Sequence, residues 1–174
     1  MNQIQAAEHH YDGLYRFALS LTKCEADAAD IVQQTYLRWV KHQNQIRDMA
    51  KMKSWLFTTL YREFIRGLKK QSRLMYLEDE ELEREMPATT QETGRAMDGK
   101  MAMEALQQVP PPFRAPLSLF YVQDFSYLEI AEVLNISKGT VMSRIYRGKQ
   151  ILKKLVESWE SAPTLNVMRQ ADGS

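Results

Sequence analysis

The feature that most constrains the fold of this 174-residue chain is a pair of helix signals close together in its C-terminal half. Ser126-Tyr127-Leu128-Glu129 fits a capping box, a pattern in which the first and last side chains satisfy backbone N–H groups at the start of a helix. The helix opened there should end at Asn135, and Ser137 can cap a second helix that runs to about Trp159. Two helices joined by a three-residue turn predict a helix-turn-helix motif.

The second of these helices carries different kinds of residues on its two sides. On a helical wheel, Val141, Ile145 and Leu152 form an apolar stripe that can pack against a small bundle. Arginine, lysine and hydroxyl side chains, which bind base edges and phosphates in a major groove, point roughly the other way. These candidate DNA-binding residues are Lys138, Thr140, Ser143, Arg144, Arg147 and Lys154. The pattern favours DNA binding over an ordinary helical hairpin with a solvated face.

A second basic face is expected in the N-terminal half, on a helix from Ser54 to about Ser72. Apolar residues such as Leu56 and Phe64 fill one side of this helix, and Glu63 is the single acid in the segment. The opposite side carries Arg62, Arg66, Lys69, Lys70 and Arg73. Charge of one sign on one helix face is typical of a surface that binds a polyanion.

Charge divides the chain into two basic parts and an acidic connector. Residues 76–98 hold eight acidic and two basic residues, whereas the remaining residues hold 21 basic and 14 acidic ones. Pro87 and Gly94 also lie in the connector. We therefore expect a domain at 1–73, an acidic linker at 74–98, a helix-turn-helix domain at 99–160 and a tail at 161–174. A short helix is expected at about 76–85.

Local signals predict the other helix boundaries. A first helix should run from about Ala6 to Leu21, and Thr22 forms a second potential capping box with Glu25. Residues 41–53 are polar without a clear period, which predicts a loop or a short irregular helix. The three prolines at 110–112 should end a helix that begins near residue 100.

Composition favours an all-α fold, made of two small helical bundles joined by the acidic linker. The 7 Gly and 6 Pro residues are too few for the turns of a many-stranded fold. Cys24 cannot form an internal disulfide and has no base near it in sequence, while the three histidines lack zinc-site spacing. The chain has neither a glycine-rich phosphate loop nor a run of eighteen apolar residues. We expect a cytoplasmic protein that is no enzyme and needs no metal or cofactor.

Three sequence runs resemble bacterial RNA polymerase sigma factors of the extracytoplasmic-function (ECF) type. Residues 123–155 are similar to the region that reads the −35 promoter element, above all in the run SKGTVMSRIYRGK at 137–149. DAADIVQQTYLRW at 27–39 resembles the polymerase-binding helix of that family, and SWLFTTLYREFIR at 54–66 resembles its −10-element helix. The resemblance covers about residues 10–72 and 100–157.

The resemblance implies a transcription initiation factor that catalyses nothing itself. Its surface for the clamp coiled coil of polymerase would comprise Asp27, Asp30, Gln33, Gln34 and Arg38. Its −10 DNA-binding residues would be Asn44, Lys51, Lys53, Arg62, Arg66, Lys69 and Lys70. The six residues named above on the recognition helix would bind the −35 element. The loop before Ser54 would receive a flipped base, and the acidic linker would thread the polymerase channel.

The implied partners are core RNA polymerase, double-stranded promoter DNA and its melted strand, without membrane insertion; an anti-sigma factor is left open. Many members of the family carry Asn and Asp where this chain has Arg62 and Arg66, which adds positive charge on the DNA-facing side. A conventional helix-turn-helix regulator, which binds its operator without polymerase, is the main alternative. A nucleic-acid-processing enzyme lacks a metal or nucleophile constellation, and a protein-interaction adaptor would leave both basic faces without a role.

Overall fold

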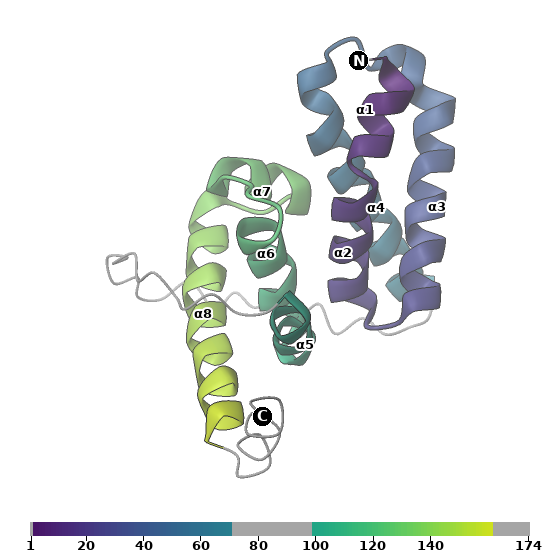
Figure 1. Ribbon diagram of the computed structural model, residues 1–174. Coiled ribbons are helices and arrows are strands. Elements are labelled where there is room, and N and C mark those ends of the chain that lie inside the picture. Colours follow the sequence, from purple (N-terminus) through teal and green to yellow (C-terminus); the bar gives the residue numbers. More distant parts are fainter. Residues whose placement is uncertain (1, 71–98, 162–174) are drawn as a thin grey trace, which may run out of the picture.

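The computed structural model describes residues 2–70 and 99–161, and every regular element within these ranges is helical. The N-terminal half consists of α1 (Gln3–His9), α2 (Tyr11–Thr22), α3 (Glu25–His42) and α4 (Met52–Lys70), with short 3-10 turns at Gln43–Gln45 and Met49–Lys51. The C-terminal half consists of α5 (Gly99–Gln108), α6 (Pro111–Tyr121), α7 (Tyr127–Leu134) and α8 (Lys138–Glu160). The all-α prediction with a helix-turn-helix is confirmed (Figure 1). The expected helix at 76–85 lies outside the described residues.

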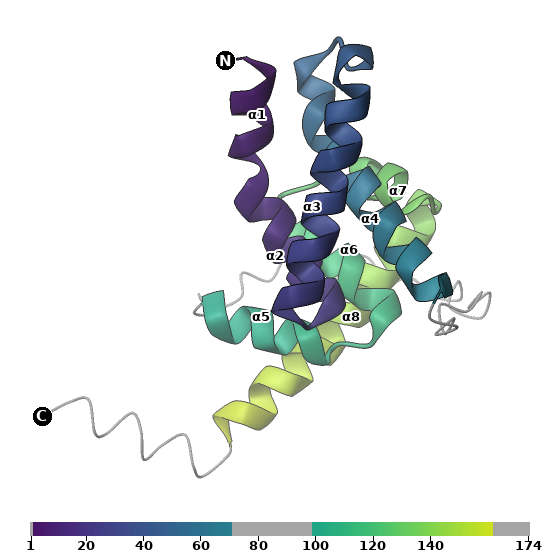
Figure 2. The same cartoon turned by 90° about the vertical axis from the view of Figure 1, so that its right-hand side faces the viewer.

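Apolar residues at helical spacing build each half. In the N-terminal half α2, α3 and α4 pack side by side, as Figure 2 shows, and α8 runs along α6 in the C-terminal half. The largest fully buried side chains are Leu14, Phe17, Val32, Met52, Leu56, Phe57, Leu60, Val109, Leu117, Leu119, Ile130 and Val133. Gly148 of α8 allows a close approach to α6, because a Cβ there would lie 2.7 Å from Leu117 Cδ1. Burial of this apolar surface is the main stabilising force.

The structure corrects three local predictions in the N-terminal half. The first helix is split at His10 into α1 and α2, and α4 begins at Met52 rather than after Ser54. The expected Thr22 capping box is absent, because the chain turns at Lys23, whose φ of 59° lies in the left-handed region. The Thr22 hydroxyl instead donates to Ala18 O at 3.0 Å. Helix α3 is therefore preceded by Cys24, which provides no side-chain cap.

The prolines at 110–112 have a second role besides the one expected. Helix α5 ends at Gln108, as the sequence predicts, but the prolines also begin the next helix. Pro111 occupies the first turn of α6, where a missing N–H leaves no hydrogen bond unmade. The irregular segment expected at 41–53 is confirmed in part: it contains the end of α3, two 3-10 turns and the start of α4.

The two halves pack against each other. Helix α2 contacts α6 and α5, and α4 contacts α7, so one continuous hydrophobic cluster includes residues of both halves. At its centre the rings of Phe57 and Phe125 meet edge to face, with centroids 5.0 Å apart. Lys53 Nζ lies 4.4 Å from the centroid of the Phe125 ring and donates to Gln123 O at 2.7 Å.

Buried polar groups also join the halves. The hydroxyls of Ser20 and Ser118, both fully buried, are hydrogen-bonded at 3.0 Å. Gln123 Nε2 donates to Gly13 O at 3.1 Å, across 110 positions of sequence. The buried guanidinium of Arg114 donates to Val109 O and to Leu21 O. Buried hydrogen-bonded groups favour one defined arrangement of the halves. A shifted arrangement would leave these donors and acceptors buried without partners, which costs free energy.

Candidate nucleic-acid interface

The helix-turn-helix forms as the sequence predicts. Ser126 accepts from the backbone N–H of Glu129 at 3.3 Å, and Glu129 Oε2 accepts from Ser126 N at 2.8 Å. These hydrogen bonds lower the pKa of the Glu129 carboxyl. The turn is made by Asn135, whose φ of 54° is left-handed and which ends α7. Ser137 then accepts from Thr140 N at 3.1 Å and begins α8.

The recognition helix does not expose its candidate residues equally. Lys138 and Lys154 are exposed, whereas Thr140 and Arg147 are half-buried. Ser143 is 7% exposed, and its hydroxyl donates to Thr140 O at 3.1 Å. The helical wheel placed Ser143 outward, but Ser143 and its neighbours Val141 and Ile145 are all buried in the structure.

Arg144, the residue most expected to read a base, faces the N-terminal half. Its Nε atom is buried and has no hydrogen-bond partner in the structure. The Arg144 charge lies close enough to Tyr61 of α4 to favour the phenolate, although burial dominates and raises the pKa of Tyr61. The buried Nε of Arg144 therefore lacks the hydrogen bond that a buried donor normally makes.

The basic face of α4 is open by comparison. Arg62, Arg66, Lys69 and Lys70 are all exposed, as are Asn44 and Lys51 in the segment before the helix. Lys53 is half-buried because it reaches across to Gln123 and Phe125. The seven residues expected at the −10 element therefore lie on α4 or on the segment leading into it, and six of them are accessible to a ligand.

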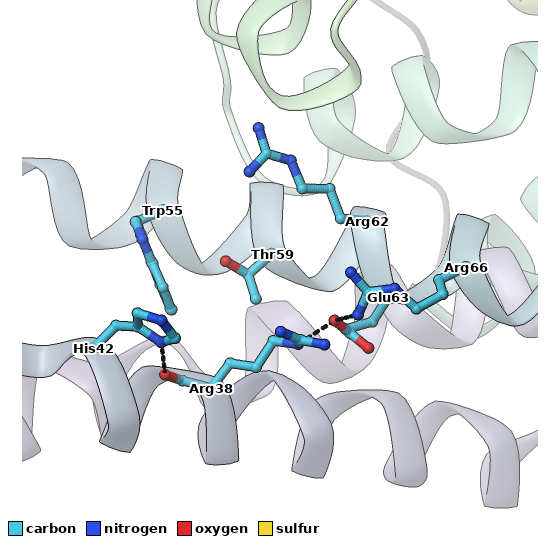
Figure 3. Close-up of a pocket in the computed structure, with 7 residues that line it drawn as sticks. All are labelled: Arg38, His42, Trp55, Thr59, Arg62, Glu63 and Arg66. Atoms are coloured by element: carbon cyan, nitrogen blue, oxygen red, sulfur yellow. Dashed lines mark hydrogen bonds and ion pairs between the residues drawn. The ribbon is translucent and has the colours of Figure 1, made fainter.

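A pocket of about 260 Å³ lies between α3 and α4. Figure 3 shows its lining: Arg38 and His42 from α3 face Trp55, Thr59, Arg62, Glu63 and Arg66 from α4. Glu63 pairs with both Arg38 and Arg66, the latter at 2.7 Å. Arg38, expected on the polymerase surface, lies at this pocket with its guanidinium paired to Glu63, and its side chain is 42% exposed. The sequence pattern did not single out His42, Trp55, Thr59 or Glu63 as neighbours of the basic face.

The other expected polymerase-binding residues lie on the open side of α3. Asp27, Asp30, Gln33 and Gln34 are exposed. Leu37 and Val40 on the same helix are also about half exposed, which is unusual for large apolar side chains. Polar and apolar groups side by side on an open helix are suited to a protein partner.

Neither a candidate metal centre nor a membrane-spanning helix occurs among the residues that the structure describes. The described parts of the chain contain no group of three His, Cys, Asp or Glu side chains arranged to hold a metal ion. Nor is any helix in residues 2–70 or 99–161 long and apolar enough to span a bilayer. Fold and surface together define a helix-turn-helix protein with a second, separate basic face.

Comparison with known proteins identifies the family. Residues 6–74 match the family model "Sigma-70 region 2", and residues 100–152 match "Sigma-70, region 4". The ECF sigma factor SigL of Mycobacterium tuberculosis is 32% identical over 149 residues, covering 84% of each chain. SigM of Bacillus subtilis is 28% identical over 147 residues, covering 84% of this chain and 90% of its own. The chain belongs to the ECF sigma factors, which act with RNA polymerase in transcription initiation.

A solved structure has the same fold. It is the sigma factor RpoE of Bartonella quintana, determined in complex with the anti-sigma factor NepR. The TM-score is 0.69 and the sequence identity 24%, with 88% of this chain and 95% of that chain covered. The resemblance inferred from the sequence runs is thereby confirmed at the level of family and fold.

Proposed function

We propose that this sigma factor binds core RNA polymerase through α3, reads the −35 element with α8 and holds the −10 region with α4 while the duplex melts. The observation that carries the proposal is the presence of two basic helix faces on different halves of one chain, next to an open mixed polar and apolar helix. A polyanion partner explains both basic faces. The place of action is the cytoplasm, and no catalysis by the chain is required.

Run-off transcription with purified core polymerase on a genomic library tests this function. We expect the chain to direct initiation at a set of related promoters, whereas core polymerase alone does not. Binding of the isolated chain to a two-fold operator, without any transcription by the mixture, would favour a conventional helix-turn-helix regulator instead.

The polymerase surface has its own test. Asp30→Arg combined with Gln33→Ala changes two exposed side chains of α3 and should weaken co-elution with core polymerase without loss of helix. The matched control is Glu160→Gln, an exposed change near the end of α8. Co-elution equal to that of the control would contradict the assignment of α3.

We further propose the domain organisation that charge predicts, with an N-terminal domain at 1–73, a linker at 74–98, a promoter-binding domain at 99–160 and a tail at 161–174. Limited proteolysis should cut first within 74–98 and leave two resistant fragments. A first cut within 110–155 would contradict it. An anti-sigma factor as a regulatory partner stays a prediction.

A further inference from the structure

The turn between α6 and α7 carries two residues that face the N-terminal half. Gln123 and Phe125 are 8% and 3% exposed, and they flank Asp124, whose φ of 56° lies in the left-handed region. The turn is tied to its own half, because Phe125 N donates to Leu119 O at 3.0 Å. Gln123 and Phe125 are therefore fixed parts of the helix-turn-helix half and move with it.

Gln123 lies directly against a glycine of α2. Its Nε2 atom donates to Gly13 O at 3.1 Å, and a Cβ at Gly13 would lie 2.6 Å from Gln123 Oε1. The same Cβ would lie 3.5 Å from Cζ of Phe57. Glycine within a helix is less stable than alanine, but alanine at position 13 would displace the Gln123 side chain. Gly13 thus lowers the stability of α2 and allows the close approach of Gln123.

Lys53 of α4 also binds this turn. Its Nζ atom donates to Gln123 O at 2.7 Å and lies 4.4 Å from the centroid of the Phe125 ring. The ammonium therefore has two favourable partners in the other half, a charge-assisted hydrogen bond and a cation–π contact. Lys53 is one of the residues expected to bind DNA, and its ammonium cannot bind a phosphate while it is held here.

A second residue expected to bind DNA lies at the contact between the halves. Arg144 of α8 is half-buried, its Nε atom is buried, and its charge lies close to Tyr61 of α4. Helix α7, which precedes α8 in the helix-turn-helix, packs against α4 (Figure 2). The packed halves therefore occupy Lys53 of one half and cover part of Arg144 of the other.

We propose that the contact between the halves is an autoinhibitory latch. Gln123 on Gly13 and Lys53 on Gln123 hold the packed form, and Arg144 becomes free for a −35 duplex only when these contacts break. The proposal rests on the proposed −35 role of α8 and adds the residues that control its access to DNA. A purely structural contact would stabilise the chain and leave the affinity of α8 for DNA unchanged.

The latch predicts that a variant which weakens it binds DNA more tightly. Only molecules whose halves have separated expose Arg144 fully, so the measured affinity rises with their fraction. One hydrogen bond changes such an equilibrium by about two- to ten-fold. Gly13→Ala displaces Gln123 and at the same time favours the α2 helix, so the N-terminal half stays folded. The matched control is Gly67→Ala in α4, where a Cβ meets nothing within 4 Å.

The experiment measures fluorescence anisotropy of a labelled −35 duplex with the full-length wild type, Gly13→Ala and Gly67→Ala at one salt concentration. The duplex is taken from a promoter found by run-off transcription. We expect about two- to ten-fold tighter binding by Gly13→Ala and no change for Gly67→Ala. Equal affinities of the two alanine variants would overturn the proposal. Run-off transcription by the wild type tests the proposed function on its own, so its failure is distinguishable from a failure of the latch.

Lys53→Gln breaks the latch at a second place and gives an unusual prediction. A protein that loses a positive charge normally binds duplex DNA less tightly. Lys53→Gln should nevertheless bind the −35 duplex about two- to ten-fold more tightly, because the ammonium contacts with Gln123 and Phe125 are lost. Lys41→Gln removes the same charge from an exposed position of α3 and should bind as the wild type does or more weakly. Binding by Lys53→Gln that is no tighter than binding by Lys41→Gln would contradict the latch.

Discussion

The two helix faces proposed to bind DNA, on α4 and on α8, differ in how accessible they are to a ligand. On α4 the basic side chains are exposed, and Glu63 is the only acid that pairs with them in the described residues. On α8 the recognition residues Ser143 and Arg144 are buried fully or in part, and Arg144 lies near Tyr61 of the other half. One face is open, whereas the other is partly covered by the half that carries the first.

The difference shows that sequence similarity to a recognition helix does not determine whether that helix is accessible. Both faces have the residue types that bind DNA. They differ in accessibility because the packing of the halves partly covers the face on α8. That packing is specific, because it includes the Phe57–Phe125 ring contact and buried hydrogen bonds.

The largest effect should come from Phe125→Ala. Phe125 is 3% exposed and contacts Phe57 across the halves, so its removal should cost about 3–5 kcal/mol of unfolding free energy. We expect faster amide hydrogen exchange in α4 and α7, which the ring joins. Denaturant unfolding and exchange mass spectrometry measure both effects. Tyr121→Ala, which removes a ring 47% exposed, is the control. Exchange that rises only within α8 would show that the ring stabilises its own half alone.

Arg144→Ala should have the next largest effect on promoter recognition. A bidentate arginine–guanine contact is worth about 1–3 kcal/mol of discrimination, so binding to the best −35 sequence should fall about ten-fold or more. Preference should relax at one or two positions. The measurement is selection from a −35 library by holoenzyme, with Lys154→Ala as a comparison that should weaken all sequences equally. A selected motif and affinity unaltered by Arg144→Ala would mean that the register of α8 in the groove is different.

Neutralising the open face should act evenly on all promoters. Arg66→Gln with Lys69→Gln removes two exposed cations of α4, and each lost phosphate contact should reduce the salt slope by about one. Open-complex formation should fall similarly for every −10 sequence. Permanganate footprinting across a promoter panel at several salt concentrations provides the data. A changed −10 preference would indicate direct reading of bases by these side chains.

The smallest effect concerns the capping box of α7. Hydrogen bonds from Ser126 lower the pKa of Glu129 in the folded state, so the charged form stabilises the fold above the unfolded pKa. That contribution is lost as the pH falls through the lowered folded pKa. Glu129→Gln keeps a capping-box side chain and should cost about 0.3–1 kcal/mol at neutral pH. The difference between the two proteins, followed by denaturant unfolding, should disappear in acid; a constant difference would exclude the charge as its cause.

Local signals in the sequence predicted the C-terminal half well. The capping box at Ser126, the turn at Asn135 and the cap at Ser137 each depend on residues within four positions of one another, and all three are confirmed. The Thr22 signal failed because Lys23 adopts a left-handed conformation that competes with it. Nothing in helical periodicity predicts that His10 divides the first helix.

Contacts distant in sequence could not be predicted. Ser20 and Ser118 are 98 positions apart, and each is an ordinary helix residue until the halves pack. Arg38 and Glu63 appear in sequence as members of separate surfaces, and only the crossing of α3 and α4 brings them into one pocket. The roles assigned to the individual DNA-binding and polymerase-binding residues stay predictions.

The packing of the halves also limits the reach of the molecule. A compact chain of 174 residues has a radius of gyration of about 16 Å. The −35 and −10 promoter elements are about 25 base pairs apart, which corresponds to about 85 Å along B-form DNA. If α8 and α4 bind the −35 and −10 elements as proposed, one molecule in this conformation is too small to reach both at once.

On the proposed function, separation of the two halves is therefore part of the equilibrium for promoter binding. The apparent dissociation constant is the intrinsic one divided by the fraction of molecules that are open. Every 1.4 kcal/mol by which the contacts between α2 and α6 and between α4 and α7 favour the packed form weakens apparent promoter affinity about ten-fold. A polymerase that binds only the open form would restore that affinity without touching a single base.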